Sequence, residues 1–140
     1  MNQAMIDELQ GEVRIQDESH IISVRKSIRE VATRLGFGIT DVTRIITAAS
    51  ELARNIYHYA GTGVMRWRIL DKGVNIGIEL IFEDHGPGIA DVDQVMQQGY
   101  STSGGLGMGL PGSKRLMDEF EIQSKIGLGT IVTVKKWKKK

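Results

Sequence analysis

The sequence predicts an α+β two-layer sandwich, in which helices cover one face of a mixed, largely antiparallel sheet. Apolar residues recur at helical spacing over 19–59, whereas they alternate over 64–83 and 120–137. The predicted strands therefore come in consecutive pairs and do not alternate regularly with helices. This order disfavours a doubly wound parallel sheet.

The first half of the chain contains a short strand and two helices. Residues 11–17 alternate in polarity as a strand, and residues 19–35 form a helix that ends at Gly36. A longer helix is predicted over 40–59, with Thr40 as its N-cap. The apolar stripe of this helix consists of Val42, Ile45, Ile46, Ala49, Leu52, Ala53 and Ile56.

The second half supplies two hairpins that are separated by helical segments. Both hairpins turn through glycine, at Asp71-Lys72-Gly73 and at Gly127-Leu128-Gly129. The predicted elements after the long helix are strands over 64–70 and 76–83, helices over 91–98 and 110–119, and strands over 120–125 and 129–137.

Composition is that of an ordinary globular protein. The 140 residues suit a single domain over 1–140, with mobile ends expected at 1–10 and 138–140. A net charge of +1 gives no general attraction to nucleic acid or membranes, and no apolar run reaches the roughly 18 residues of a spanning helix. Because cysteine and a basic, apolar leader are absent, we expect a cytoplasmic protein without disulfides or thiolate metal sites.

Two surface features bear on possible partners. Five of the last six residues are lysine, which we interpret as a solvated end that guards the terminal strand against edge-to-edge pairing. Contact with an acidic partner surface is the alternative. No heptad repeat or contiguous apolar strip indicates a subunit interface, so we expect a monomer or a weak homodimer.

The first candidate site lies on the long helix. Glu51 and Asn55 are four residues apart and therefore lie one above the other on a helix. A carboxamide oxygen suits Mg²⁺, which prefers oxygen ligands, and a carboxylate one turn away could take a proton from a nearby hydroxyl. A solvated pair on a helix surface is the ordinary alternative.

The second candidate site follows the apolar strand over 76–83, in the run Glu-Asp-His-Gly-Pro-Gly-Ile. The acidic residue at the strand end could accept a hydrogen bond from an adenine amino group. Gly86 and Gly88 allow a sharp turn and a close approach of the backbone to a flat base. An ordinary tight turn is the alternative.

The third candidate site is the glycine-rich run over 100–110, ahead of a helix. Four glycines among the six residues 104–109 expose backbone N–H groups, and the following helix adds its positive end, which together suit phosphate. No Gly-Lys-Ser/Thr follows, so this is not a Walker A loop, and no βαβ unit surrounds it. A later Gly129-Thr130 pair could present the threonine hydroxyl to a ligand on the helix side of the sheet.

In this order, the four segments resemble the GHKL superfamily of Bergerat-fold proteins, which contains gyrase-type ATPases, histidine kinases, MutL and the anti-sigma-factor serine kinases. Glu51 and Asn55 match its N box, 84–88 its first glycine box, 104–109 its second, and Gly129-Thr130 its late Gly-Thr element. The runs SELARNIY, EDHGPGI and GYSTSGGLGMGLPGSKRLMDEF are similar to the serine-kinase branch, in particular the switch kinases of stressosome pathways.

This resemblance implies an ATP-dependent serine/threonine protein kinase. It implies Asn55 on Mg²⁺, Asp84 on the adenine amino group, Glu51 as the catalytic base, and residues 89–109 as a lid. The implied substrate is a STAS-domain protein, and the implied second partner is a phosphatase of the PP2C type. The implied ATP-binding residues are Asn55, Asp84, Gly86, Gly88, Ser101, Thr102, Ser103, Gly104, Gly105, Leu106, Gly107, Met108, Gly109, Leu110 and Thr130.

Three other functions compete with the kinase. A histidine kinase would use His20 as phosphoacceptor, but the sequence leaves no room for a dimerisation hairpin before the N-box helix. A gyrase- or MutL-like ATPase couples hydrolysis to a following domain with a catalytic lysine, and these 140 residues contain none. A nucleotide-gated binding module, which sequesters or activates a partner, could have the same fold and pocket. The carboxylate of Glu51 favours catalysis over this last alternative.

Overall fold

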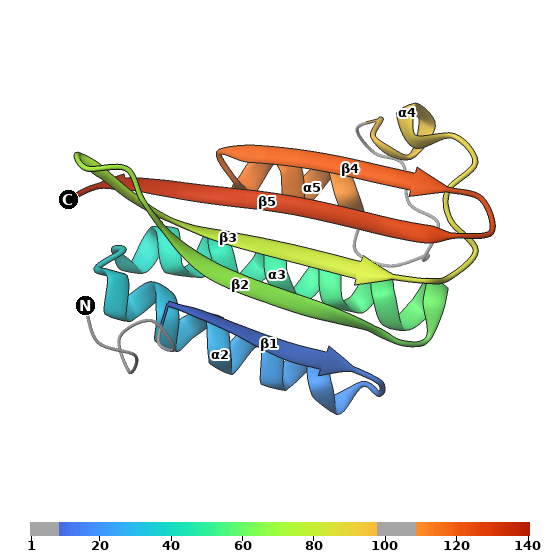
Figure 1. Cartoon of the computed structure of the whole chain (residues 1–140), viewed down its shortest axis with the longest axis horizontal. Helices are drawn as coiled ribbons and strands as arrows, with labels where there is room; N and C mark the ends of the chain where they lie inside the picture. The colour runs from blue at the N-terminus through green and yellow to red at the C-terminus, as the bar shows by residue number, and fades with distance from the viewer. Residues whose placement is uncertain (1–8, 98–108) are drawn as a thin grey trace.

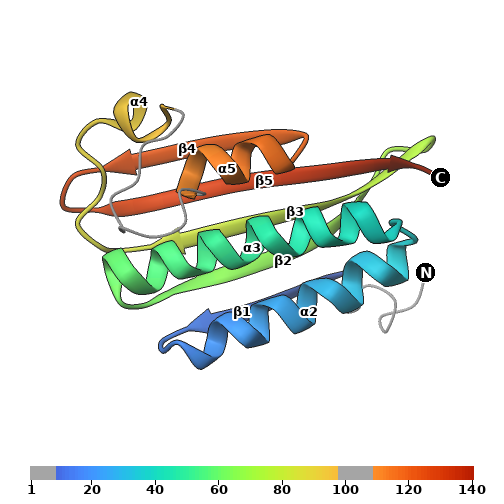
Figure 2. The ribbon, with the colours of Figure 1, turned by 180° about the vertical axis from the view of Figure 1, so that it is seen from behind.

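A computed structural model describes residues 9–97 and 109–140 of the chain. These residues form two layers, a five-stranded sheet and a layer of helices on one of its faces (Figures 1 and 2). The elements are β1 (Gln10–Ile15), α2 (Ser19–Leu35), α3 (Ile39–Ala60), β2 (Gly63–Asp71), β3 (Asn75–Asp84), α4 (Val92–Val95), α5 (Gly109–Leu116), β4 (Glu119–Lys125) and β5 (Gly129–Lys139).

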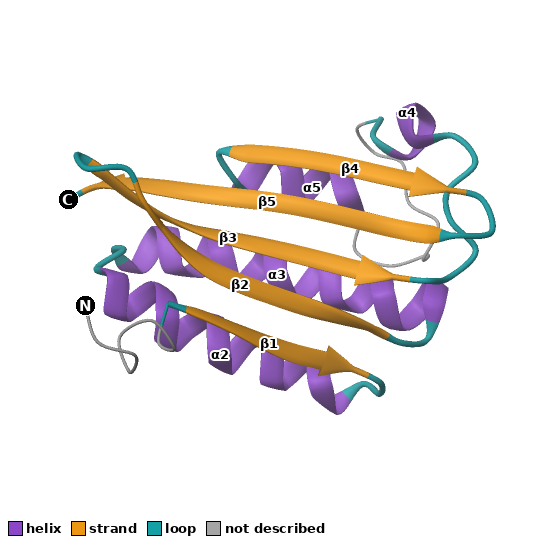
Figure 3. Cartoon of the chain, viewed as in Figure 1, coloured by secondary structure: helices purple, strands orange, loops and turns teal. Residues whose placement is uncertain are grey.

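The sheet has the strand order β1-β2-β3-β5-β4, and all four of these pairings are antiparallel. β3 therefore lies at the centre, between β2 and β5 (Figure 3). The register sets Asp84, the last residue of β3, opposite Thr130 on β5. The predicted two-layer α+β sandwich is confirmed.

The long helix α3 lies across the sheet between α2 and α5 (Figure 2). All seven residues of its predicted apolar stripe are buried. Gly61, with φ +83°, ends the helix because the left-handed region is open to glycine. None of the described helices is both long and apolar enough to cross a membrane.

The predicted N-cap of α3 is wrong. The helix begins at Ile39, and its N-cap is Gly38, which has extended backbone angles and makes no side-chain capping bond. The Gly38 carbonyl accepts the first helical hydrogen bond from Val42 N–H at 2.9 Å. Thr40 therefore lies inside the first turn, because extended glycine already provides the geometry of a helix start.

The core lies between α3 and the inner face of the sheet. On the three central strands, alternate side chains point toward the helices and are buried, as the period of two in a strand requires. Burial of one such side chain stabilises the fold by roughly 1.5–3 kcal/mol. The inner-face residues are Met65, Ile78, Leu80, Phe82, Val132 and Val134.

The opposite face of the sheet carries a row of alternating charges. Arg68, Glu79, Lys135 and Glu119 lie opposite one another across β2, β3, β5 and β4. Arg68 Nε is 2.5 Å from Glu79 Oε1, and this hydrogen bond raises the pKa of the guanidinium above its ordinary value. Lys135 Nζ lies 3.8 Å from Glu79 and 3.9 Å from Glu119. Such cross-strand pairs favour this register on a face without helices.

The lysine-rich end of the chain is part of β5 through Lys139, two residues beyond the predicted strand. Lys136 is on the inner face and is only 8% exposed. Its Nζ donates to the Leu116 carbonyl at 3.0 Å and lies 3.4 Å from Asp118 Oδ1. Lys136 thus holds the C-terminal end of α5 against the sheet, which the interpretation of a solvated end did not anticipate.

We expect Lys136→Met to lower the free energy of unfolding by about 1–3 kcal/mol, because the Leu116 carbonyl would lose the buried amine that donates to it. Urea unfolding followed by circular dichroism measures this change. Lys138→Met is the matched control, since the Lys138 amine donates to the adjacent Lys139 carbonyl. Its effect should stay within about 0.5 kcal/mol. Equal losses in the two variants would contradict an anchoring role for Lys136.

Candidate functional site

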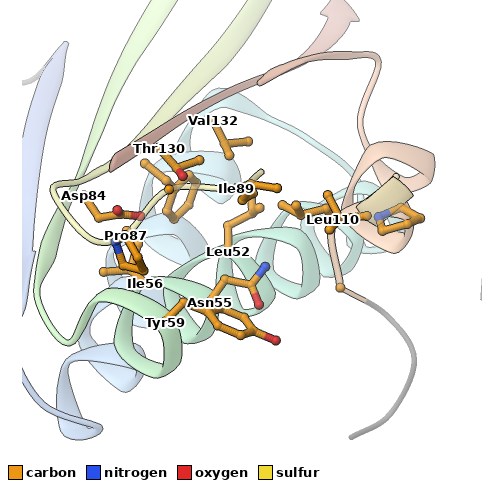
Figure 4. A pocket seen from close by; sticks show the side chains of 15 residues that line it. Leu52, Asn55, Ile56, Tyr59, Asp84, Pro87, Ile89, Leu110, Thr130 and Val132 are labelled. Atoms are coloured by element: carbon orange, nitrogen blue, oxygen red, sulfur yellow. The ribbon is translucent and has the colours of Figure 1, made fainter. Parts of the chain in front are cut away.

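A cavity of about 260 Å³ opens between α3 and the sheet, at the end where β3 stops and α5 begins (Figure 4). Its walls are mainly apolar, as is usual in pockets for flat organic ligands. Asp84 is the charged residue among the described residues that line it. The lining residues are Leu52, Asn55, Ile56, Tyr59, Phe82, Asp84, Pro87, Gly88, Ile89, Val95, Gly109, Leu110, Pro111, Thr130 and Val132.

Two of the predicted site residues lie side by side on the sheet wall of this cavity. Asp84 and Thr130 are register partners on β3 and β5, and both line the cavity (Figure 4). Directly opposed residues in an antiparallel pair have Cβ atoms roughly 4.5–5.5 Å apart. Asp84 Oδ1 accepts a hydrogen bond from Gly86 N–H at 2.9 Å, which orients the carboxylate. Within residues 9–97 and 109–140, the hydrogen bond from Gly86 engages Oδ1 and leaves Oδ2 available to a ligand.

The two N-box residues of α3, Glu51 and Asn55, differ in their position relative to the cavity. Asn55 lines the cavity from the helix side, near Tyr59 (Figure 4). Glu51, one turn earlier, is not among the lining residues. Its side chain is 17% exposed, and its Oε1 lies 2.5 Å from Arg54 Nη1. The structure therefore brings Asn55, Asp84 and Thr130 together and leaves Glu51 beside them, outside the described cavity wall.

The loop after β3 lies directly against the turn between β4 and β5. Gly88 has φ +78°, and a Cβ there would lie 2.3 Å from the Lys125 carbonyl oxygen. Pro87 accepts a hydrogen bond from Gly127 N–H at 2.9 Å. Gly86 has equally little room, since a Cβ would lie 2.6 Å from Ala60 Cβ. Both glycines thus lie close to other parts of the chain, and Gly88 also lines the cavity.

Ser124 on β4 contacts two of the lining residues, a position that the sequence did not reveal. Its Oγ accepts a hydrogen bond from Ile89 N–H at 2.8 Å and lies 2.7 Å from Thr130 Oγ1. The signal in the sequence is weak, because a single serine in the alternating run EFEIQSK is unremarkable. The apolar wall residues Pro87, Ile89, Val95 and Pro111 were also missed, because they come from three separate segments, the loop after β3, α4 and α5.

The start of α5 contributes to the cavity through Gly109 and Leu110, two of the predicted ATP-binding residues. A helix N-terminus presents free N–H groups and a positive dipole end, which suits an anionic group. The other predicted residues of this segment lie outside the described residues. They are Ser101, Thr102, Ser103, Gly104, Gly105, Leu106, Gly107 and Met108.

No group of three or more acidic, histidine or cysteine side chains that could hold a metal occurs in residues 9–97 and 109–140. At the cavity, Asn55 supplies a carboxamide oxygen from the helix wall, and Asp84 supplies a carboxylate from the sheet wall. Mg²⁺ retains several waters and is commonly bound by one or two protein oxygens together with substrate phosphates. The residues present therefore fit a magnesium ion that arrives with a nucleotide, and not a resident metal centre.

A protein-family model and several relatives assign the chain to the same family. The family of histidine kinase-like ATPase domains matches residues 15–136. The chain is 54% identical to serine/threonine-protein kinase RsbT of Bacillus subtilis over 126 residues, which are 89% of this chain and 94% of that protein. It is 35% identical to anti-sigma F factor of Caldanaerobacter subterraneus over 81% of this chain and 82% of that protein.

Solved structures agree on the fold. The RsbU and RsbW domains of a Mycobacterium tuberculosis protein match with a TM-score of 0.59 and 20% identity, over 90% of this chain and 32% of that one. Mycobacterial sensor histidine kinase MprB matches with a TM-score of 0.53 and 17% identity, over 91% and 97% of the two chains. At these identities the likeness concerns the fold alone.

The resemblance to the GHKL superfamily and to its serine-kinase branch is thus confirmed from two directions. Among the described residues, Asn55 of the N box lies on the helix wall of the cavity, and Asp84 of the first glycine box lies on its sheet wall. The similarity to the RsbT kinase extends over most of both chains. The chain belongs to the family of histidine kinase-like ATPase domains.

Proposed function

We propose that this chain is an ATP-dependent protein serine/threonine kinase. One observation carries the proposal: the described cavity is an apolar slot with a carboxylate, Asp84, on its sheet wall and a carboxamide, Asn55, on its helix wall. A base needs the apolar slot and the carboxylate, and a metal-bound phosphate chain needs the carboxamide. The 54% identity to a protein named as a serine/threonine kinase supports the same activity.

The residues around the slot fit an adenine base. Leu52, Ile56 and Phe82 are buried, and together with Val132 they supply apolar surfaces on both the helix and the sheet side. Asp84 Oδ2 would accept a hydrogen bond from the exocyclic amino group, since Oδ1 already accepts from Gly86. A nucleotide with its base here would have its phosphates toward Asn55 and the N-terminus of α5.

Asn55 would hold Mg²⁺ through its carboxamide oxygen. When bound, this ion neutralises the negative charge of the phosphates, which is a large part of phosphoryl-transfer catalysis. The N-terminal end of α5, beginning at Gly109, would contribute its dipole to the same charge. The chain's own task is then mainly to position the nucleotide and the acceptor hydroxyl.

Glu51 would act as the general base. Its carboxylate would take the proton of a serine or threonine hydroxyl as the new O–P bond forms and the bond to the leaving ADP breaks. One carboxylate oxygen, Oε1, is engaged by Arg54, so Oε2 is the proton acceptor in this proposal. A base of this kind contributes typically 10²–10⁴-fold to the rate.

The partners we propose follow from the relatives. Proteins named as an RsbT kinase and as anti-sigma F factors are regulatory, and they support a regulatory protein as the substrate of this chain. Within that class we propose a STAS-domain protein as phosphoacceptor and a phosphatase of the PP2C type as a second partner. A lid that responds to nucleotide would allow one chain to serve both.

A second candidate function is a nucleotide-gated binding module without transfer activity. One observation favours it, namely that Glu51 lies outside the described cavity wall and is paired with Arg54. A module of this kind needs the base-binding slot and Asn55 but has no use for a free carboxylate. The two candidate functions therefore predict different effects of Glu51 variants: loss of phosphate transfer in a kinase, and no effect in a binding module.

We expect Asn55→Ala to abolish measurable binding of ATP in the presence of Mg²⁺, because the carboxamide is the protein's ligand to the ion. Isothermal titration calorimetry with ATP and Mg²⁺ measures this loss. Arg44→Ala is the matched control, since Arg44 is on the same helix and its exposed side chain pairs with Asp41 away from the cavity. Unchanged ATP affinity in Asn55→Ala would exclude the proposed metal ligand.

We expect Glu51→Gln to bind ATP as the unchanged chain does and to transfer phosphate at least about 100-fold more slowly, because a carboxamide cannot take the hydroxyl proton. Intact-protein mass spectrometry of a STAS-domain partner, incubated with the chain and Mg-ATP, measures the transfer. One added phosphate with the unchanged chain supports the kinase. A chain that binds ATP and adds none supports the binding module, and normal transfer by Glu51→Gln rules out the general base.

A further inference from the structure

We propose that Arg54 is a positioning residue, which keeps the Glu51 carboxylate away from a metal ion bound at Asn55 and so leaves it free to accept a proton. Arg54 does not line the cavity and acts on the reaction through Glu51. This inference rests on the proposed function, because it requires Asn55 as the metal ligand and Glu51 as the general base.

Two side chains that can bind Mg²⁺ lie one turn apart on α3. Mg²⁺ prefers oxygen ligands, and the charged oxygens of a carboxylate attract it more strongly than a neutral carboxamide does. Asn55 nevertheless lines the cavity, whereas Glu51 does not. A carboxylate that bound the ion would be lost as a base, because a nearby cation stabilises its ionised form. A kinase with this pair of residues therefore needs a restraint on Glu51.

The geometry of the helix identifies the restraint. With about 3.6 residues per turn, residue i+3 lies about 60° to one side of residue i, and residue i+4 lies about 40° to the other. Arg54 and Asn55 therefore flank Glu51 on opposite sides. The cavity is on the side of Asn55, which lines it together with Leu52 and Ile56 (Figure 4). Arg54 is on the side that faces away from the cavity.

The observed contact draws the Glu51 carboxylate toward this outer side. Arg54 Nη1 donates to Glu51 Oε1 at 2.5 Å. The Glu51 side chain is 17% exposed and that of Arg54 is 40% exposed, so water screens the pair only in part. Among the hydrogen bonds of residues 9–97 and 109–140, this one engages Oε1 and leaves Oε2 to accept the hydroxyl proton.

A second pair on α3 has the same spacing and lies away from the cavity. Arg44 Nη1 is 3.1 Å from Asp41 Oδ1, again three residues apart, and neither residue lines the cavity. Arg44→Met therefore removes an arginine and an ion pair from the same helix without freeing a carboxylate next to Asn55. It is the matched control for Arg54→Met.

The first test is the Mg²⁺ dependence of ATP binding by the full chain, measured by isothermal titration calorimetry at a series of Mg²⁺ concentrations. In Arg54→Met we expect the Mg²⁺ concentration for half-maximal binding to fall about two- to fivefold, the equivalent of one partly exposed ion pair, because the freed carboxylate can reach the ion. In the background of Glu51→Gln the same substitution should have little effect, because only the loss of one positive charge remains.

The second test is a gain of binding. Asn55→Ala lacks the proposed metal ligand, and the further substitution Arg54→Met should restore part of the Mg²⁺-dependent binding of ATP. The physical reason is that Glu51, once released, can supply the missing oxygen. Arg44→Met in the background of Asn55→Ala should restore none.

The third test is phosphate transfer to a STAS-domain partner, followed by intact-protein mass spectrometry at saturating Mg-ATP. Arg54→Met should transfer phosphate about two- to fivefold more slowly, although it binds the ion more tightly. A variant that only loosened α3 would weaken both. Arg54→Lys keeps a cation at the same spacing and should restore both values, and Arg54→Gln gives the same decision if Arg54→Met does not fold.

An unchanged Mg²⁺ dependence in Arg54→Met would overturn the inference, since Glu51 would then stay away from the ion without the pair. An equal effect in the background of Glu51→Gln would overturn it as well, because the charge of Arg54 alone would explain the change. Either result leaves the kinase standing if the unchanged chain transfers phosphate. A chain that binds Mg-ATP and transfers none overturns the proposed kinase and, with it, the role of Arg54.

Discussion

The constraint on which the site depends is a contact between two stretches of backbone. The loop after β3 lies so close to the turn between β4 and β5 that Gly88 and Gly129 have no space for a side chain. A Cβ on Gly129 would lie 2.1 Å from the Asp84 carbonyl oxygen, and one on Gly88 would lie 2.3 Å from the Lys125 carbonyl oxygen. This contact places the Asp84 carboxylate beside the Thr130 hydroxyl and brings Ile89 within reach of Ser124.

The two faces of the sheet serve the site in different ways. The inner face packs on α3, so that the buried helix stripe determines where Asn55 stands relative to the sheet. The outer face has no helix and is crossed by alternating charges from Arg68 to Glu119. Pairs of this kind contribute modestly to stability, but they favour a single strand register. That register is what sets Asp84 opposite Thr130.

The relatives and the geometry support different parts of the proposed function. Similarity over most of the chain to an RsbT kinase and to anti-sigma F factors supports a regulatory protein kinase. The distant structures, at 20% identity and below, support the fold only. The cavity supports a flat base and a metal ligand on the helix wall, and Glu51, paired with Arg54, lies one turn from that ligand.

Much of the architecture followed from local patterns. The period of apolar residues identified the helices and strands, because a helix or strand that buries one face must repeat its apolar side chains at its own period. The glycine runs and the spacing of Glu51 and Asn55 identified the motifs, because each motif is a short run of neighbouring residues. The N-cap of α3 was misplaced because an extended glycine, Gly38, can start a helix without any side-chain signal.

What only the tertiary structure decided is which side chains meet. Asn55 lines the cavity and Glu51 does not, although the helix places them on neighbouring turns. Ser124, on an edge strand, bonds to Ile89 of the cavity wall, and Lys136, within the lysine-rich end, bonds to the last residue of α5. Contacts between residues far apart in the sequence depend on strand register and on helix packing, and no local pattern of residues encodes either. The sequence by itself thus determined the elements and the candidate chemistry, and the packing of the two layers decided which residues can act together.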